Sequence, residues 1–294
     1  MSLRYDDIGN RLRAFRLGSG LPAEEVARSI GISRTALYRF EKGEVVKIET
    51  LQKLAELLRV SLPTLLGVSV EYIASALTYF ERMRQIEETA EHIIVLAGPL
   101  SYLLASDEFN AVLGQLLKES IPESVDDIRR AEAEVDEIMV VLRQRKETYR
   151  RRQPTIVNLL AASEISRFLI NGMVGHLDLP EPVRRERREL ARAEVEHFAR
   201  IIEQEPIGVQ IGIVLETLPH TGFQIFRQPD RQLLSLSPFR LGEEPNVRVG
   251  VAMITSAPEG LALHKGAAEG MWRRALKGRT AADYLRDLIA RHCQ

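Results

Sequence analysis

Six polar side chains fall within ten residues of the N-terminal region, and their types suit hydrogen bonding to nucleic acid. They are Ser33, Arg34, Thr35, Tyr38, Arg39 and Lys42. An arginine can donate two parallel hydrogen bonds to a guanine edge, and hydroxyl groups can bond to bases or phosphates. We therefore expect Arg34, Thr35 and Tyr38 to contact base edges or neighbouring phosphates. Arg39 should chiefly contact phosphate.

Two short predicted helices would position these side chains. Val26, Ala27 and Ile30 recur at helical spacing and form a buried stripe. Gly31 follows, where a residue in the left-handed conformation would end the first helix. Ser33 stands where an N-cap hydroxyl accepts a hydrogen bond from the second helix. That helix is expected to bury Ala36, Leu37 and Phe40 and to expose the polar side chains.

This stretch resembles the helix-turn-helix of Xre/Cro/C1-type regulators. The resemblance rests on Ile8–Arg16, the Gly31-Ile-Ser33 turn, the Phe40-Glu-Lys-Gly43 exit, Leu51–Val60 and Ser61–Leu66. It implies an all-α, five-helix, lambda-repressor-like DNA-binding domain over residues 1–67, whose second motif helix enters the major groove. One departure is Ala23, preceded by Pro22, where the family usually places a polar side chain that touches phosphate. The contacts of the later helix should therefore matter more.

Length and composition place a second domain after the first one. The chain has 294 residues, a formal net charge of −1 and a single cysteine, Cys293. Basic residues outnumber acidic ones over residues 1–66, and the remainder is net acidic, which is the polarity expected of a phosphate-binding domain on an acidic body. No signal peptide, membrane span, zinc-ligand spacing or cofactor fingerprint is found. We expect a cytoplasmic protein without a cofactor or metal.

Residues 68–91 form a predicted connection. Val70, Ile73, Leu77 and Phe80 recur at three- and four-residue intervals and predict one helix with a broad apolar face. Such a face must be buried. The helix is expected either to form a dimer or couple the two domains, or to pack on its own effector domain.

Residues 92–294 are predicted to be an α/β domain with a mixed sheet covered by helices. Apolar, β-branched runs alternate with helical periods, and several strands follow one another after residue 208. The expected strands are 92–98, 136–142, 155–160, 209–216, 222–227, 232–237 and 248–255. From Gly208 onward the chain resembles uncharacterised effector domains of Xre-type regulators, through Ser237–Arg240, Glu244–Asn246 with Val249–Val251, and Met271–Ala275. Its element order is also similar to phospholipase D-like sensor domains.

No catalytic signature is found in this second domain, and we expect no enzyme. His264-Lys265 lacks the intervening residue and the aspartate that a phospholipase D site needs. Effector binding is expected at polar residues on otherwise apolar strands. The candidates are Arg227, Ser235, Ser237 and Arg240. The basic run Arg143–Arg152 could bind an anion or add DNA contacts, but we expect a solvated helix end.

The sequence as a whole predicts a homodimeric transcription regulator. It would bind a near-palindromic double-stranded DNA operator and respond to a small-molecule effector of unknown identity. Two alternatives stay open: an antitoxin-like repressor whose body binds a partner protein, and an enzyme fused to an autoregulatory DNA-binding domain.

Overall fold

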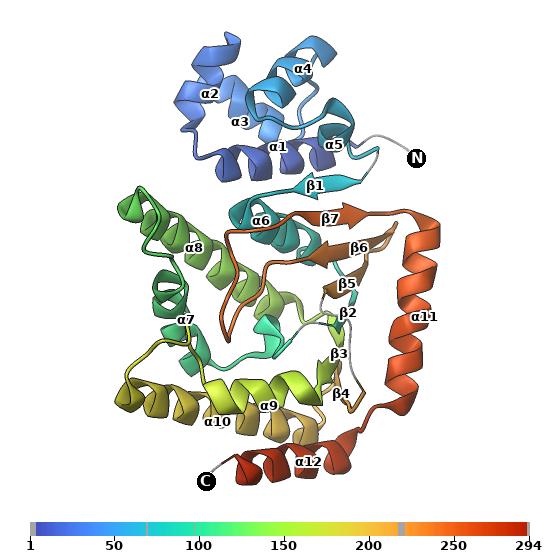
Figure 1. Ribbon diagram of the computed structural model, residues 1–294. Coiled ribbons are helices and arrows are strands. Elements are labelled where there is room, and N and C mark those ends of the chain that lie inside the picture. The colour runs from blue at the N-terminus through green and yellow to red at the C-terminus, as the bar shows by residue number, and fades with distance from the viewer. Residues whose placement is uncertain (1–3, 69, 97, 217–220, 293–294) are drawn as a thin grey trace.

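The computed structural model describes residues 4–68, 70–96, 98–216 and 221–292, so Cys293 lies outside the described part. Five N-terminal helices form a small unit at one end of the molecule, and a larger α/β body forms the rest (Figure 1). The predicted fold class is confirmed in both parts. Of the described helices, none is long and apolar enough to cross a membrane.

The N-terminal unit consists of α1 (Tyr5–Ser19), α2 (Ala23–Ile30), α3 (Arg34–Glu41), α4 (Ile48–Leu57) and α5 (Leu62–Leu66). Its core contains the fully buried Leu12, Leu37, Leu54 and Leu65. Burying a leucine of this kind contributes roughly 1.5–3 kcal/mol. The helices therefore hold together through a shared apolar centre.

Local signals set the ends of these helices. Gly31 ends α2 in the left-handed conformation, with φ of 75°. The Ser33 hydroxyl accepts a hydrogen bond from the backbone N–H of Ala36 at 3.1 Å and caps α3. Ser61 caps α5 in the same way through Thr64. The turn and cap predicted from the sequence are both present.

The connection after α5 differs from the single helix that we expected. Residues Glu71–Ile73 form strand β1, which pairs antiparallel with β7 (Ala252–Thr255), and helix α6 covers only Ala76–Glu87. The apolar residues of this segment fit a helical period, but a sheet edge was available for β1 to extend. Strand β1 pairs with the sheet, and α6 packs against α1 and α8.

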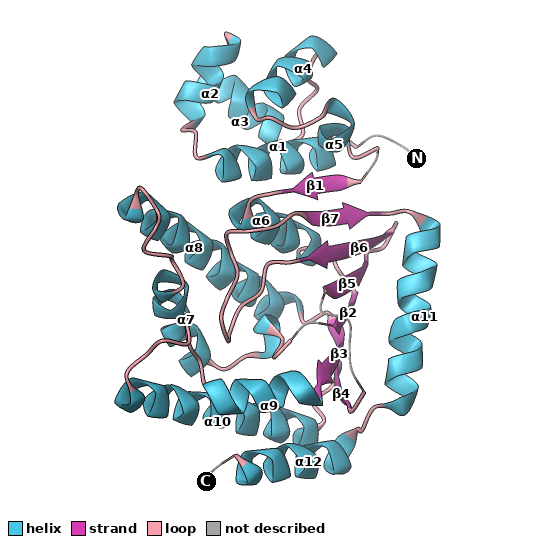
Figure 2. Ribbon diagram, in the orientation of Figure 1, coloured by secondary structure: helices cyan, strands magenta, loops and turns pink. Residues whose placement is uncertain are grey.

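The described strands form one seven-stranded mixed sheet in the order β1-β7-β6-β5-β2-β3-β4 (Figure 2). Strands β2 (His92–Leu96), β3 (Thr155–Ala161) and β4 (Val209–Val214) are parallel. Strands β5 (Gly222–Arg227), β6 (Gln232–Ser237) and β7 are antiparallel to their neighbours. The sequence predicted β5 and β6 with the observed bounds.

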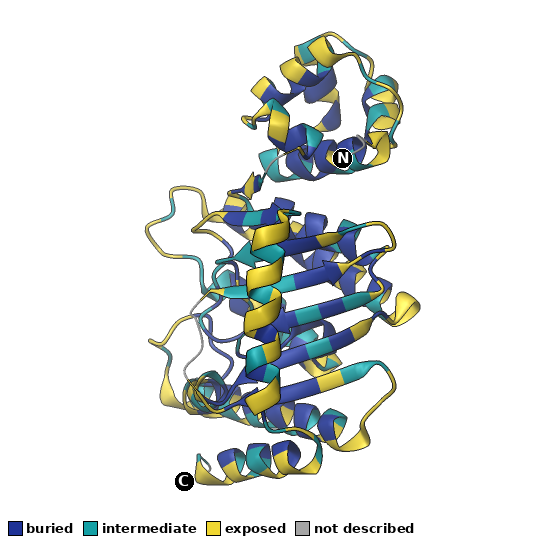
Figure 3. Ribbon diagram, turned by 90° about the vertical axis from the view of Figure 1, so that its right-hand side faces the viewer, coloured by how far each residue is buried: buried dark blue, intermediate teal, exposed yellow. Residues whose placement is uncertain are grey.

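Helices cover the two faces of the sheet unequally. The larger core lies on the face that α6, α8 (Ile128–Arg152), α9 (Ala162–Asn171) and α10 (Glu181–Gln204) cover, with α7 (Asp107–Glu119) packed beside them. Helix α11 (Pro258–Arg274) alone crosses the other face over a smaller apolar cluster (Figure 3). Helix α12 (Gly278–Arg291) ends the body beside α10.

One predicted strand is wrong. Residues 136–142 lie inside the 25-residue helix α8. Val135, Ile138, Met139 and Leu142 are buried, whereas Val140 is exposed. This three- and four-residue spacing is that of a helix face, and it outweighs the strand propensity of the β-branched run.

Candidate functional site

The outward face of α3 carries the side chains predicted to read DNA. Arg34, Thr35, Tyr38 and Arg39 are exposed, as is Lys42, which caps the C-terminal end of the helix. Within the described chain, no side-chain hydrogen bond or ion pair joins Arg34 or Lys42 to another residue. Both cations are therefore available to an anionic partner.

Arg39 is less available than expected. Its Nε lies 2.7 Å from both carboxylate oxygens of Glu44, and these hydrogen bonds raise the pKa of Arg39 above its ordinary value. Contact with a phosphate would require the guanidinium to leave Glu44. Because both side chains are exposed, that exchange takes place in solvent, where such pairs contribute little.

Helix α1 holds α3 in a fixed orientation. Arg16 donates from Nη2 to Glu41 Oε2 at 3.0 Å, and both side chains are buried. The Arg16 guanidinium also lies 6.0 Å from the centre of the Tyr38 ring. At Gly9 the two helices are so close that a Cβ would lie 2.5 Å from the Phe40 carbonyl oxygen. The exposed face of α3 is therefore presented on a closely packed support.

The start of α2 is poorly suited to a phosphate. Ala23 is buried, and the first turn carries Glu24 and Glu25, whose charges oppose an anion there. Glu24 is paired with Arg28 at 3.1 Å. That α3 has to supply more of the contacts to DNA stays a prediction.

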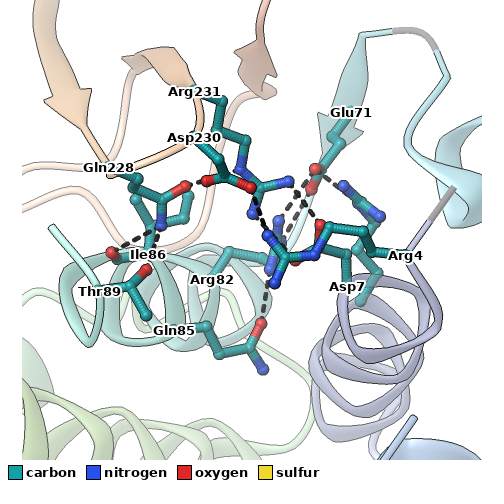
Figure 4. A network of polar contacts seen from close by, with 11 residues as sticks. Arg4, Asp7, Glu71, Arg82, Gln85, Ile86, Thr89, Gln228, Asp230 and Arg231 are labelled. Atoms are coloured by element: carbon teal, nitrogen blue, oxygen red, sulfur yellow. Dashed lines mark hydrogen bonds and ion pairs between the residues drawn. The ribbon is translucent and has the colours of Figure 1, made fainter. Parts of the chain in front are cut away.

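A buried ionic cluster joins the helix-turn-helix unit to the body (Figure 4). Glu71 of β1 lies between two arginines: Arg11 of α1 donates from Nε at 2.7 Å, and Arg82 of α6 donates from Nε and Nη2 at 2.8 and 2.9 Å. All three side chains are buried. Burial alone would raise the pKa of Glu71, but the two guanidinium groups outweigh it and the pKa is lowered.

Further contacts extend this cluster to the turn between β5 and β6. Arg231 donates to both carboxylate oxygens of Asp7 on α1, at 2.6 and 2.9 Å. Gln85 of α6 donates to the Asn10 carbonyl oxygen at 2.9 Å. We call the cluster of Asp7, Arg11, Glu71, Arg82, Gln85 and Arg231 the joint. It connects α1 to β1, α6 and the body at once.

Helix α6 is largely buried within this chain. Its residues from Ala76 to Met83 are all buried, and it packs between α1 and α8. A Cβ at Gly18 of α1 would lie 1.6 Å from the Thr78 hydroxyl oxygen, so the two helices touch closely. Helix α6 therefore contacts the helix-turn-helix unit and the body at once.

The body contains a cleft of about 500 Å³ on the α6 side of the sheet. It lies where β2 and β3 end and β5 begins, with the end of β6 on its other side. The carboxyl ends of parallel strands are the usual ligand site of open α/β sheets. The volume falls in the range of small-molecule pockets.

The predicted effector residues are only partly brought together. Ser237 and Arg240 line the cleft. Ser235 is buried directly behind it, with its hydroxyl 3.1 Å from the Tyr79 hydroxyl. Arg227 lies at the far end of β5, exposed and 3.9 Å from Glu91, and does not take part.

Among the lining residues that the sequence analysis missed are Tyr79, Tyr102, Arg145 and Glu164. The basic run Arg143–Arg152 was expected to be solvated, which is wrong for Arg145 and Lys146, because both are buried. Arg145 pairs with Glu87 of α6 at 2.6 and 3.0 Å. Burial lowers the pKa of Arg145, but Glu87 outweighs this effect and the pKa is raised.

Residues 12–65 match the family described as Helix-turn-helix. The matched segment runs from α1 to α5 and contains the α2–turn–α3 motif. It confirms the predicted Xre-type helix-turn-helix and with it a DNA-binding regulator. No curated protein matches the chain. Among the described residues, no group of three or more His, Cys, Asp or Glu side chains could hold a metal ion.

Proposed function

We propose that this protein is a ligand-responsive transcription regulator, in which α3 reads double-stranded DNA and the cleft of the body holds a small-molecule effector. The observation that carries the proposal is the position of α6. Tyr79 and Phe80 of this helix line the cleft. Within two turns, Arg82 and Gln85 belong to the joint and bond to Glu71 of β1 and to the Asn10 carbonyl oxygen of α1.

An effector would act by favouring one placement of the helix-turn-helix unit over another. A ligand shifts an equilibrium only as far as it binds one state better than the other. A molecule in the cleft touches α6 directly, and α6 contacts α1 through buried side chains. Movement of Tyr79 or Phe80 would therefore shift α6 against α1, and α1 supports α3.

We propose further that the regulator works as a homodimer on a near-palindromic operator. Each chain has one helix-turn-helix unit, which suits one half-site. Two recognition helices about 34–36 Å apart would meet successive major grooves. The body is proposed to bind its ligand without converting it. Native mass spectrometry of the purified protein reports the dimer mass and any retained ligand or partner protein together.

The DNA-binding part is tested by replacing Arg34. An operator is first selected from random double-stranded DNA, and affinity is then measured by fluorescence anisotropy. Arg34→Ala should lose about 1–3 kcal/mol of binding free energy and selectivity at one position, as expected for a bidentate base contact. Arg279→Ala is the matched control, because Arg279 is an exposed arginine on α12 of the body. Unchanged affinity and selectivity of Arg34→Ala would refute the role of α3.

A further inference from the structure

The chemistry of the cleft wall indicates what kind of molecule would fit. We infer that the cleft binds a neutral, planar, mostly apolar molecule that carries a carbonyl or hydroxyl group, and that this group bonds to Tyr102. The inference rests on the proposed function, since it names the ligand class of the same cleft. Three observations support it: the aromatic walls, the balanced charges and an unpartnered hydroxyl.

Aromatic rings from four separate segments surround the cleft. They belong to Tyr79, Phe80, Tyr102, Phe223 and Phe239. The rings of Tyr79 and Phe80 are tilted by 59° with centres 5.4 Å apart, and Phe239 lies 5.7 Å from Tyr79 on another side. Flat faces and edges of this kind favour a planar ring system, because aromatic pairs gain from offset or edge contacts.

The charges around the cleft cancel. Of its described lining residues, only Arg145, Glu164 and Arg240 are charged. Arg145 is buried and already neutralised by Glu87, and its guanidinium lies 5.6 Å from the centre of the Phe80 ring and 5.8 Å from that of Tyr102. Glu164 and Arg240 carry opposite charges, and neither is fully buried. An ionic ligand would lose its hydration without meeting a spare buried counter-charge.

Tyr102 supplies the specific polar contact. Its hydroxyl is buried, and no described residue hydrogen-bonds to it. Burial raises the pKa of Tyr102 to about 12, so the phenol stays protonated and can donate. The Tyr79 hydroxyl, by contrast, already bonds to Ser235 and lies 3.4 Å from the Gln224 amide. The hydroxyl oxygen is sealed from the cleft in this conformation, so a small turn of the Tyr102 ring would be needed for a ligand oxygen to become the partner that it lacks.

The test uses three naphthalene dyes of similar size in fluorescence titrations of the full chain. Prodan is a neutral ketone, phenylnaphthylamine is neutral without a carbonyl, and anilinonaphthalene sulfonate is an anion. We expect prodan to bind with a blue shift and the sulfonate to bind at least tenfold more weakly. Tighter binding of the sulfonate would overturn the neutral ligand class.

Variants then locate the dye and its hydrogen bond. Val249→Trp, at an exposed lining residue, should weaken both neutral dyes, whereas Val251→Trp, exposed but outside the lining, should weaken neither. Tyr102→Phe should weaken prodan by about five- to tenfold, the value of one hydrogen bond, and leave phenylnaphthylamine unchanged. Equal effects of the two tryptophan variants on dye binding would contradict the placement of the dye in the cleft. Equal losses of affinity for the two neutral dyes in Tyr102→Phe would contradict the hydrogen bond.

Operator affinity, measured on the same samples, separates this inference from the proposed function. Intact DNA binding without prodan binding would mean that the ligand class is wrong while the DNA-binding role stands. In another outcome, prodan binding changes in the variants as expected while saturating prodan leaves operator affinity unchanged. That result would support the ligand class and refute the coupling between the cleft and DNA binding.

Discussion

Removing the carboxylate of Glu71 should be among the most damaging single changes outside the apolar core. Glu71 is 3% exposed and accepts hydrogen bonds of 2.7, 2.8 and 2.9 Å from Arg11 and Arg82. Glu71→Gln keeps the size of the side chain but leaves two buried guanidinium groups without a counter-charge. Breaking a buried ion pair in this way costs about 3–5 kcal/mol.

Urea unfolding followed by circular dichroism measures this loss, and Glu24→Gln provides the matched control. Glu24 makes a single exposed pair with Arg28, so the same substitution there should cost less than about 0.5 kcal/mol. A triple variant that replaces Arg11, Glu71 and Arg82 by Met, Leu and Met should recover most of the stability, because it removes both charges together with their partner. A loss for Glu71→Gln no larger than that for Glu24→Gln would refute the structural role of the joint.

The remaining predictions concern α3 and pH. Ser33→Ala removes the N-cap of α3 and should lower the free energy of unfolding by about 1 kcal/mol, measured by urea titration; an unchanged midpoint would contradict the cap. Glu44→Gln should release Arg39 and steepen the salt dependence of operator affinity by about one phosphate contact, and an unaltered slope would mean that Arg39 does not reach the DNA. The folded pKa of Glu71 and that of Asp7 lie below the ordinary 4.5 and 3.8. Their pairing therefore stabilises the protein fully above those values and is lost as the pH falls through the folded pKa. Melting temperature should drop more steeply below about pH 4.5 in the native protein than in the triple variant, and parallel curves would count against this reasoning.

Local chemistry explains why the sequence determined the helix-turn-helix unit. Gly31 and Ser33 end one helix and begin the next through bonds to residues within a few positions. Strands β5 and β6 could be predicted equally well, because an apolar run bounded by turn residues indicates a strand without reference to distant partners. For these elements, the residues that decide the structure are neighbours in the chain.

Other features depended on partners far along the chain, and only the tertiary structure decided them. Strand β1 has three residues, too few for a pattern, and it is a strand because the edge of β7 lies beside it. Burial of Arg145 requires Glu87, 58 positions away, and that of Arg11 requires Glu71. A charged side chain is buried at a tolerable cost only when an opposite charge is buried beside it. The sequence by itself thus determined the helix-turn-helix unit and the exposed face of α3, and the tertiary structure decided the cleft and its connection to that unit.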